Sequence, residues 1–503
     1  QGSLGLPEPN YYSDTDERTA TIRAEYEKYV AKIFTLLGDA PGAAAAKARN
    51  VLRLERDLAA ASLTRVQRRD IEAQYNPRPF TDLATVTPSI DWTRYVRAVD
   101  APQFDRINVA HPKYYAELDR QLKTTPIAEW RDYLRFRITD AMAPYLSKAF
   151  DDAEFEFRGR TLSGRKQQHP RERRCVSWTD DLLGEPLGQV YAERHFTPAT
   201  KARALEMIEN LRTALRSNIG TVGWMDPKTK EQGLRKLDAI ALKIGYPEKW
   251  IDYSSVTTDR TSFAGNVLRA QSFLARRPIE KIGKPVDKSE WQMSTPTVNA
   301  YNNPVWNEIV FSAGILQPPF YDPLADDAYN YGGMGAVIGH EMIHDFDDQG
   351  RLFDASGSMS DWWTSTDAKE FEKRAQCVAD QFSSFELGNG LKMDGKLVLG
   401  ESIADLGGLK IAYAAYQKSL EGKPRQIIDG FTPEQRFFLG WARIWSDNAT
   451  REAIELQAKT DPHPISEYRV NGPLSNLPEF AAAFGCPATK PMVRADDKRC
   501  GVW

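Results

Sequence analysis

Cysteine is scarce in this sequence, and its spacing excludes the common small cysteine motifs. The 503 residues contain four cysteines, Cys175, Cys377, Cys486 and Cys500, and no two of them stand in a C-x-x-C arrangement. Zinc-ribbon and thioredoxin-like motifs are therefore excluded. Four scattered cysteines fit two disulfides in an oxidising compartment and free thiols in a reducing one equally well.

An excess of charge and a long apolar run are also lacking. Lysine and arginine number 66 against 69 acidic residues, which gives no electrostatic reason to expect nucleic acid or an anionic membrane as a partner. No stretch approaches the roughly 18 apolar residues of a membrane helix. The start, QGSLGLPEP, has neither the basic nor the apolar part of a signal peptide. We expect no nucleic-acid partner and no membrane segment in this chain.

What the sequence does contain is helical periodicity over most of its length. Apolar residues recur every three and four positions in 16–37 and in 201–219, which predicts helices there and, by the same pattern, almost everywhere up to about residue 250. Residues 294–320 are instead rich in turn-forming, β-branched and aromatic residues, which predicts short strands. Helices then resume, one of them opened by a capping box from Thr432 to Gln435.

The fold class predicted from this pattern is mainly α with a small β-sheet. A chain of 503 residues is too long for one core, so we expect at least two domains. We place a helical domain in residues 1–264, with interdomain linkers, and a catalytic domain in 265–503. Residues 158–174, which are basic and without a clear period, are expected to be a solvated loop, with an anion site as the alternative.

The segment GHEMIHDFDDQG, residues 339–350, carries the strongest chemical signal. On a helix, His340 and His344 lie one above the other on one face, so both imidazoles can bind a single ion. Glu341 is then turned just enough to act on a water at that ion, which is the HExxH arrangement of zinc hydrolases. The alternative is an ordinary helix with two buried histidines.

A catalytic zinc needs a third protein ligand, and the sequence offers more than one candidate. The metzincin extension is excluded, because Asp347 and Gly350 stand where it requires glycine and histidine. Glu370 and Glu372 remain possible at a longer spacing. The better candidate is GESIADLGG, residues 400–408, in which Glu401 could bind zinc.

Asp405, four residues after Glu401, could then accept a hydrogen bond from a zinc histidine and fix its tautomer. Gly407 and Gly408 would cost about 1 kcal/mol each in an isolated helix. We therefore expect another helix to pack closely against them.

A peptide-cleaving mechanism also needs donors for the oxyanion of the tetrahedral intermediate. In the remaining chain only His463, in TDPHPISEYR, is a clear candidate, with Arg469 six residues later. A histidine followed by proline is also compatible with a simple loop residue, so residue type leaves this role open.

With HEMIH, GESIAD and VNAY identified, the sequence closely resembles the neprilysin family of zinc endopeptidases, including its bacterial oligopeptidase members. The similarity covers most of the chain and includes the segments GLPEPNYY, GWMDPKTKEQGLRKLDAIALKIGYP, NEIVFSAGILQPPFY, YGGMGAVIGHEMIHDFDDQGR and CGVW. The resemblance implies two largely helical domains enclosing a central cavity, a thermolysin-like catalytic domain, one zinc ion per chain, and peptide substrates.

The resemblance also implies residue roles. The zinc ligands would be His340, His344 and Glu401, with Glu341 as base and Asp405 behind the metal. His463 would stabilise the transition state. Residues expected to bind the substrate backbone are Asn299, Ala300 and Arg469. Residues expected to line the pocket for the side chain after the scissile bond, with ordinary core packing as the alternative, are Ile315, Phe320, Val337, Ile444 and Trp445.

The cysteines and the start of the chain take their interpretation from the same resemblance. Cys377 and Cys500 match a family disulfide, which favours an extracytoplasmic compartment, whether periplasmic, secreted or membrane-anchored. Cys175 and Cys486 would pair with cysteines nearer the N-terminus. Because the chain begins well inside the family pattern, we expect the preceding segment to be a separate polypeptide held by burial.

The predicted function is hydrolysis of oligopeptides on the amino side of large hydrophobic residues, by a zinc-bound water that Glu341 activates. A gluzincin that uses Glu370 or Glu372 is one alternative. A catalytically silent peptide-binding or adhesion protein that keeps the fold is the other.

Overall fold

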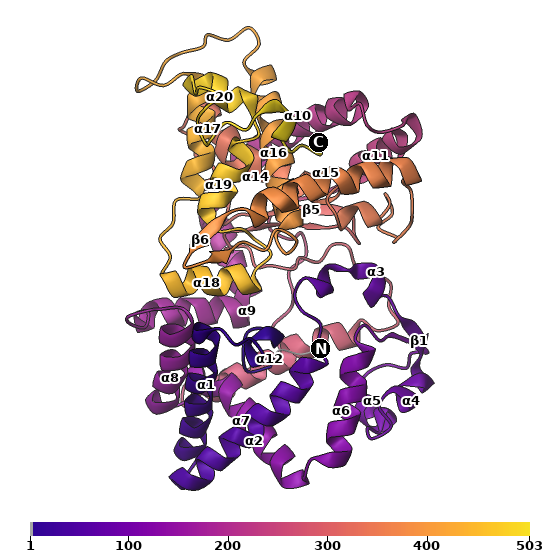
Figure 1. Ribbon diagram of the computed structural model, residues 1–503, viewed down its shortest axis with the longest axis vertical. Helices are drawn as coiled ribbons and strands as arrows, with labels where there is room; N and C mark the ends of the chain where they lie inside the picture. The colour runs from indigo at the N-terminus through magenta and orange to yellow at the C-terminus, as the bar shows by residue number, and fades with distance from the viewer. Residues whose placement is uncertain (1–3) are drawn as a thin grey trace. The chain divides into compact units, whose positions relative to one another are not determined.

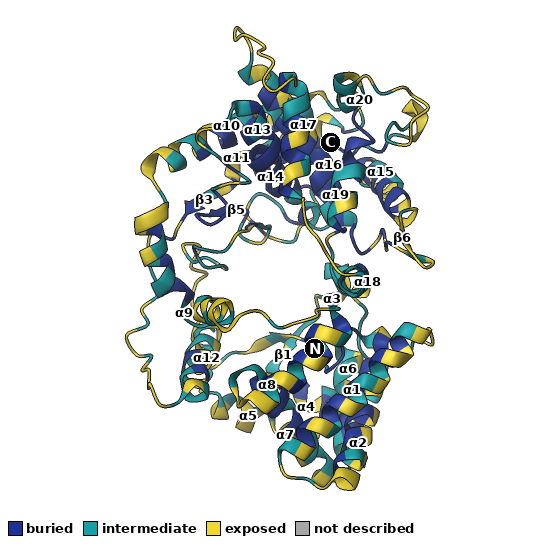
Figure 2. Ribbon diagram, turned by 90° about the vertical axis from the view of Figure 1, so that its left-hand side faces the viewer, coloured by how far each residue is buried: buried dark blue, intermediate teal, exposed yellow. Residues whose placement is uncertain are grey.

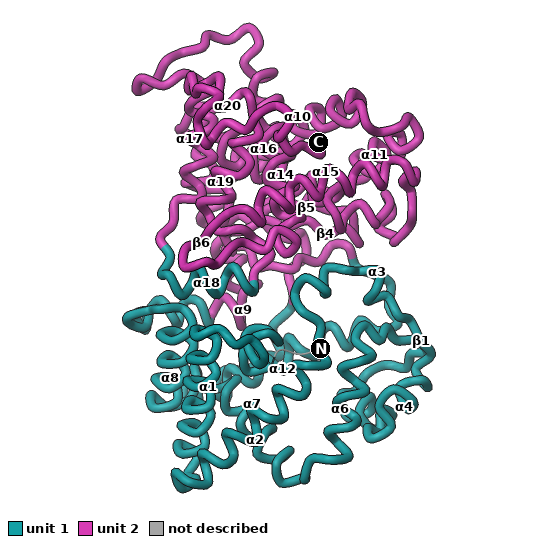
Figure 3. The backbone as a smooth tube through the Cα atoms, viewed as in Figure 1, with its two compact units in different colours: residues 1–178, 252–287, 449–460 teal, residues 179–251, 288–448, 461–503 magenta. Residues whose placement is uncertain are grey.

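Helices account for most of the chain in the computed structural model, which describes residues 4–503 (Figure 1). The chain forms two units, and each is made of three segments (Figure 3). Unit 1 comprises residues 1–178, 252–287 and 449–460, and unit 2 comprises 179–251, 288–448 and 461–503. The predicted domain boundary is a single one, between residues 264 and 265. The units differ from it because α10 and α11, early in the chain, pack with elements of unit 2.

Unit 1 is a helical assembly with a small two-stranded sheet. Its helices are α1 (Glu17–Leu36), α2 (Pro41–Ala60), α3 (Ile71–Gln74), α4 (Leu83–Val86), α5 (Trp92–Ala98), α6 (Pro112–Thr124), α7 (Ile127–Met142), α8 (Lys148–Glu154), the π-helix η5 (Phe155–Leu162), α12 (Phe263–Glu280) and α18 (Arg451–Thr460). Its antiparallel strands are β1 (Pro77–Pro79) and β2 (Arg106–Asn108). Helix α9 (Arg171–His195) runs from unit 1 into unit 2 and is kinked at Leu183.

Unit 2 combines helices with a three-stranded sheet of β3, β4 and β5 and a two-stranded antiparallel one of β6 and β7. Its helices are α10 (Pro198–Thr221), α11 (Pro227–Ala239), α13 (Asp327–Asn330), the π-helix η6 (Tyr331–Gly335), α14 (Ala336–His344), α15 (Ser365–Ser383), α16 (Leu399–Ser419), α17 (Pro433–Ile444), α19 (Ser466–Leu474) and α20 (Pro478–Phe484). Its strands are β3 (Ala241–Gly245), β4 (Ala300–Asn303), β5 (Glu308–Ser312), β6 (Glu386–Gly388) and β7 (Leu391–Lys392).

The prediction of a mainly helical chain with a small sheet is confirmed. The periodic segment 16–37 forms α1, with Asp16 accepting the N–H of Thr19 as N-cap, and the segment 201–219 lies within α10. The capping box is present, because the side chains of Thr432 and Gln435 each accept the other's backbone N–H.

The basic segment 158–174 was wrongly predicted to be a loop throughout. Residues up to Leu162 continue a π-helix whose buried side chains include Phe155 and Phe157, and α9 begins at Arg171. A π-helix closes its hydrogen bonds at i→i+5, so its apolar residues do not recur with the period of an α-helix. The sequence pattern therefore missed it.

The small sheet of unit 2 has the strand order β3-β5-β4. Strand β5 pairs in parallel with β3 and antiparallel with β4, with Ala300 opposite Phe311. Both β4 and β5 lie within residues 294–320, as predicted. Strand β3 lies in the stretch that was predicted to be helical. The sequence did not reveal it, because five residues are too few for periodicity to separate a strand from a helix. Strand β4 is an edge strand, which pairs with β5 on one side and with no other strand of the described residues.

Helices α14 and α16 form the centre of unit 2 (Figure 2). Helix α14 is almost wholly buried and has no polar face, as expected for a helix surrounded by protein. Helix α16 is buried from Ser402 to Leu409, and its second half exposes one stripe at Lys410, Ala414 and Lys418. The two helices cross at Gly339 and Gly408: a Cβ on Gly339 would lie 2.5 Å from the carbonyl oxygen of Gly408, and a Cβ on Gly408 would lie 2.3 Å from the backbone nitrogen of His340. The predicted close packing at the paired glycines of GESIADLGG is confirmed.

The C-terminus is fixed to unit 2 by a disulfide and by polar contacts. Cys377 on α15 is bonded to Cys500, as the resemblance implied, with Cα atoms 5.6 Å apart. Lys410 on α16 donates a hydrogen bond to the carbonyl of Trp503 at 2.8 Å. The pairing expected for Cys175 and Cys486 stays a prediction. Within residues 4–503, no helix is both long and apolar enough to cross a membrane.

Candidate active site

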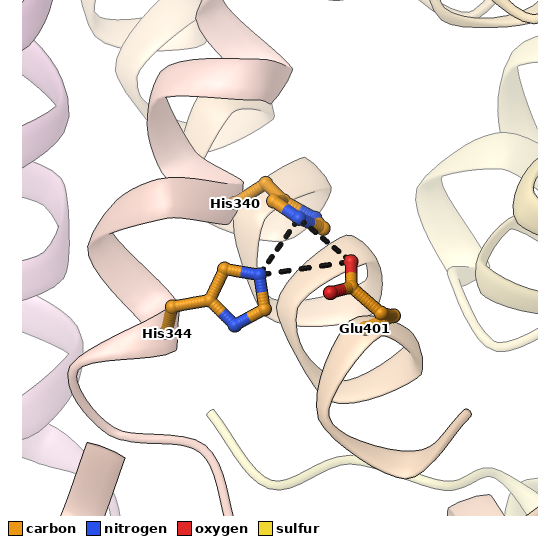
Figure 4. Close-up of side chains that lie close together, drawn as sticks. All are labelled: His340, His344 and Glu401. Atoms are coloured by element: carbon orange, nitrogen blue, oxygen red, sulfur yellow. Dashed lines mark hydrogen bonds and ion pairs between the residues drawn. The ribbon is translucent and has the colours of Figure 1, made fainter. Parts of the chain in front are cut away.

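Three side chains from two helices converge on one point in unit 2 (Figure 4). His340 and His344 project from α14, and Glu401 projects from the first turn of α16. The Nε2 atoms of the two histidines lie 2.9 Å apart. The Oε2 atom of Glu401 lies 3.2 Å from Nε2 of His340 and 3.6 Å from Nε2 of His344. The crossing at Gly339 and Gly408 lets the two helices approach closely enough for this.

Two carboxylates fix the orientation of the histidine rings. The Nδ1 atom of His340 lies 2.7 Å from Asp405, and that of His344 lies 2.7 Å from Asp347. Each Nδ1–H therefore donates to a carboxylate, and each Nε2 is the ring atom that can bind a cation at the centre of the cluster. Asp405 was proposed from the sequence for this position behind His340. Asp347 was not, although its place three residues after His344, one turn along the chain, was a usable signal.

The donor set fits a zinc ion. Two imidazole Nε2 atoms and one carboxylate oxygen face one another, and within residues 4–503 the buried Oε2 atom of Glu401 has no hydrogen-bond partner. Such a cluster of acceptors repels itself unless a cation lies among them. Ligand atoms at about 2.0–2.1 Å from a tetrahedral zinc stand about 3.3 Å apart, which is close to the three separations observed here.

The electrostatics of the cluster favour a cation as well. Burial disfavours the charged form of Glu401, yet the nearby histidines outweigh burial and hold the pKa of Glu401 well below its usual range. Burial likewise opposes protonation of His344, but Glu401 and Asp347 raise its pKa well above the usual value. A metal ion binding here would displace protons from the imidazoles, so its affinity depends on pH.

Glu341 is buried beside the cluster. It is 6% exposed, and burial raises its pKa, against the opposing influence of His340 and His344. A carboxylate whose basicity is raised by its surroundings is suited to accept a proton near neutral pH.

His463 reaches the same centre from the loop before α19. Its Nε2 atom lies 3.4 Å from Oε2 of Glu401. Asp461 orients it, because the Asp461 carboxylate accepts both the backbone N–H at 2.9 Å and the ring Nδ1–H at 2.7 Å. The role of Asp461 was missed in the sequence, where an aspartate two residues before a histidine is not distinctive.

Arg469 lies behind the cluster and is buried. Its guanidinium donates to both carboxylate oxygens of Asp405, at 2.7 and 2.8 Å, and lies 3.6 Å from Oε2 of Glu401. It also stacks over the Trp445 ring at 3.9 Å from the centroid. Burial opposes its charge, but Asp405 and Glu401 raise the pKa of Arg469, so the guanidinium stays protonated.

The predicted substrate-binding residues lie in the same unit. Ala300 begins edge strand β4, which packs beside α14, and Asn299 directly precedes it. Phe320 and Ile444 meet at Gly333, at the entry to α14: a Cβ there would lie 2.6 Å from the Phe320 carbonyl oxygen and 3.4 Å from the Ile444 side chain. Val337, Ile444 and Ile315 are buried, whereas Phe320 and Trp445 are partly exposed.

The alternative third ligands lie elsewhere. Glu370 and Glu372 are on α15, where Glu370 pairs with Arg374 at 3.0 Å and Glu372 pairs with Arg351 at 3.5 Å. Neither belongs to the group of side chains that could hold an ion with the two histidines.

A helix that carries two histidines in HExxH spacing, with a glutamate from a second helix beside them, defines a zinc metalloendopeptidase of the glutamate-ligated type. The comparisons agree with this class. Residues 1–247 match the N-terminal model of peptidase family M13, and residues 299–500 match its catalytic model. The chain belongs to peptidase family M13.

Individual relatives are similar over the whole chain. The chain is 36% identical to an endothelin-converting enzyme homolog of Locusta migratoria, covering 100% of this chain and 71% of the relative. It is 33% identical to Neprilysin-3 of Drosophila melanogaster, covering 100% of this chain and 66% of that protein. Among solved structures, zinc metalloprotease Zmp1 of Mycobacterium tuberculosis in complex with an inhibitor has 39% identity and a TM-score of 0.96, covering 100% of this chain and 77% of the other. The predicted resemblance to the neprilysin family is confirmed.

Proposed function

We propose that this protein hydrolyses oligopeptides on the amino side of large hydrophobic residues, with Glu341 as the general base. The observation that supports it most directly is the convergence of His340, His344 and Glu401 within 4.8 Å of one another, with the buried Glu341 carboxylate beside them.

The proton transfers fall to Glu341. Zinc, when bound by the three side chains, supplies a Lewis acid that polarises the substrate carbonyl and favours ionisation of water near neutral pH. Glu341 accepts a proton from the attacking water and then delivers it to the leaving amine nitrogen. Its raised pKa keeps the proton available for that second transfer.

His463 and Arg469 supply the positive groups that this reaction needs. The tetrahedral intermediate places negative charge on the former carbonyl oxygen, and donors already held in position stabilise it. The Nε2–H of His463, with Nδ1 bound to Asp461, is the donor that we assign to this oxygen when the imidazole carries both protons. Arg469, held by Asp405 and by Trp445, is assigned to a substrate carbonyl.

The substrate backbone is proposed to bind beside β4. Its open edge offers backbone groups to an extended peptide, in the manner of an added strand, and Asn299 would add a side-chain amide. Phe320, Val337, Ile444 and Trp445 form the apolar wall proposed for the residue after the scissile bond, with Ile315 as a further candidate. Burying one large apolar side chain there is worth roughly 1.5–3 kcal/mol, which favours such residues in the substrate.

An extracytoplasmic location is part of the proposal. The disulfide between Cys377 and Cys500 supports it, because disulfides persist in oxidising compartments and are uncommon in reducing ones.

The test is a mixed peptide library digested by the wild type and by Glu341→Gln, each with and without a chelator. The wild type should cut before large hydrophobic residues, and the chelator should stop it. Glu341→Gln should lose about 10²- to 10⁴-fold in turnover while retaining zinc. The control is Glu372→Gln, an exposed glutamate outside the cluster, which should cleave as the wild type does.

Three outcomes would count against the proposal. Unchanged turnover in Glu341→Gln would exclude its role as base. Cut sites that ignore the following side chain would exclude the apolar pocket. Binding of peptides without cleavage by the zinc-loaded wild type would favour the non-catalytic peptide-binding alternative.

A further inference from the structure

One lysine in unit 2 is almost completely buried, although the proposed reaction does not use it. Lys236, on α11, is 1% exposed. Its Nζ atom donates to the backbone carbonyls of Asp345, Gly350 and Phe353 at 2.7, 2.7 and 2.8 Å. An ammonium group has three N–H donors, so each of them has one carbonyl partner.

All three carbonyls belong to the turn that follows the HExxH helix. Helix α14 ends at His344, and residues 345–353 fold back on themselves. The fold is tight at Gly350, where a Cβ would lie 1.8 Å from the carbonyl oxygen of His344. The Asp345 carbonyl at the helix end lacks a partner within the helix, and in a buried site it needs a donor. Lys236 supplies that donor from another helix. It adds a second donor to the carbonyls of Gly350 and Phe353, which also accept the Phe353 N–H and the Trp362 Nε1–H, each at 3.1 Å.

The same turn holds Asp347, whose carboxylate orients His344. One oxygen of Asp347 faces Nδ1 of His344 at 2.7 Å, and the other accepts the backbone N–H groups of Gln349 and Gly350 at 2.8 and 2.7 Å. Gly350 thus donates to Asp347 through its N–H and accepts from Lys236 through its carbonyl. A continuous series of hydrogen bonds runs from Lys236 through Gly350 and Asp347 to His344.

We propose that Lys236 is a positioning residue of the metal site: it holds the turn 345–353 in the shape that keeps Asp347 against His344. Its ammonium gathers three carbonyls from positions up to eight residues apart, and no apolar side chain could replace those hydrogen bonds. The Asp345 carboxyl lies 3.8 Å from Nζ and is itself fully buried, within ion-pair distance of the ammonium when it is ionised. This inference rests on the metal site of the proposed function.

The test measures zinc affinity rather than cleavage alone. Lys236→Met keeps most of the side-chain length and removes the three donors, and Lys236→Gln keeps two N–H donors on a shorter side chain. Zinc affinity is measured by competition with a chelator, on folded protein well below the melting temperature. Loss of the group that orients a metal-binding histidine typically costs 10- to 100-fold in affinity, so we expect a weakening of about this size in Lys236→Met and a smaller one in Lys236→Gln.

The matched control is Lys243→Met. Lys243 also lies in unit 2 and is largely buried. It donates to the carbonyl of Glu290 at 2.8 Å and pairs with the buried Glu308 at 2.7 Å, but it does not contact the turn 345–353 in these hydrogen bonds. It should lose stability as Lys236→Met does, with zinc affinity within about twofold of the wild type. A Lys236→Met protein that is folded and binds zinc as tightly as the wild type would overturn the inference.

Hydrogen exchange of the wild type gives a second measurement that needs no variant. The backbone N–H groups of Gln349 and Gly350 should be protected in the zinc-free protein, since Lys236 and Asp347 order the turn without the ion. Rapid exchange of both amides in otherwise folded zinc-free protein would contradict the proposal, even if Lys236→Met failed to fold. A wild type that bound no zinc would instead overturn the proposed function, while rapid exchange of these amides would still count against the role of Lys236.

Discussion

Two buried glutamates, one in each unit, show how the same side chain serves two purposes. Glu55 in unit 1 is 0% exposed and accepts hydrogen bonds from the Gly5 N–H at 3.0 Å and from the hydroxyls of Tyr12 and Tyr26 at 2.9 and 2.8 Å. The Glu401 side chain in unit 2 is 13% exposed, yet its buried Oε2 atom has no hydrogen-bond partner among the described residues. Burial is common to both, and only the supply of donors differs.

The pKa values of the two carboxyls move in opposite directions. Burial raises the pKa of Glu55, and Arg137 and the two tyrosines only partly offset it. The histidines beside Glu401 lower its pKa well below the usual value in spite of burial. A buried carboxylate whose oxygens are supplied with donors, here two hydroxyls, a backbone N–H and Arg137 at 3.4 Å, is part of the fold. One that faces two imidazole Nε2 atoms is suited to bind a cation.

Of the two glutamates, Glu401 should give the larger effect when it is replaced. Glu401→Gln should lose zinc retention, and peptide turnover should fall by about 10³-fold or more, because a metal contributes several kcal/mol to stabilising the transition state. The measurements are metal content after dialysis and cleavage of a fluorogenic peptide. Retention of zinc by this variant would mean that another side chain is the third ligand.

Replacing Glu55 should instead lower stability and leave zinc binding unchanged. Glu55→Gln disturbs a buried carboxylate with several donors, so unit 1 should lose roughly 1–3 kcal/mol in free energy of unfolding. Zinc affinity should stay at the wild-type value. Urea unfolding and the chelator competition give the two quantities, and a loss of zinc affinity without a loss of stability would contradict the distinction drawn here.

Asp461 is an intermediate case, because it is a hydrogen-bonded carboxylate that belongs to the site. Asp461→Ala frees the His463 ring, so we expect kcat to fall by about tenfold, a modest part of the 10²- to 10³-fold cost of removing an oxyanion donor altogether. Zinc affinity should not change. Asp394→Ala is the control, since Asp394 accepts from the Lys396 and Leu397 N–H groups in a turn of the same unit. Equal kcat in both variants would remove Asp461 from the mechanism.

The smallest expected effect is a pH dependence of stability through Glu55. Its pKa in the folded chain is raised above the unfolded value, so the folded state holds the proton more tightly. The stabilisation is complete below the unfolded pKa and is lost as pH rises through the folded pKa. The stability advantage of the wild type over Glu55→Gln should therefore shrink as pH rises from about 4.3 towards neutrality. Unfolding both proteins in urea across this range checks it, and a growing difference would show the opposite sign.

The sequence was sufficient wherever the signal is local. His340 and His344 share a face because four residues make about one helical turn, and Thr432 and Gln435 close a capping box within a single turn. The paired glycines of GESIADLGG indicated a close helix contact, and Gly339 and Gly408 supply it. Segments without an α-helical period were predicted less well: residues 158–162 of η5 were taken for part of a loop, and β3 was too short to be distinguished from a helix.

The sequence by itself determined the donor atoms, their pairing on α14 and the family to which the chain belongs, because these depend on residue type and on backbone periodicity over a few positions. The tertiary structure alone decided that the Glu55 carboxylate is surrounded by hydrogen-bond donors and that Oε2 of Glu401 is not. It also decided that Lys236, more than a hundred residues before the turn, lies against that turn. Such contacts depend on which helix faces pack together, and residues far apart in the chain carry no local record of that packing.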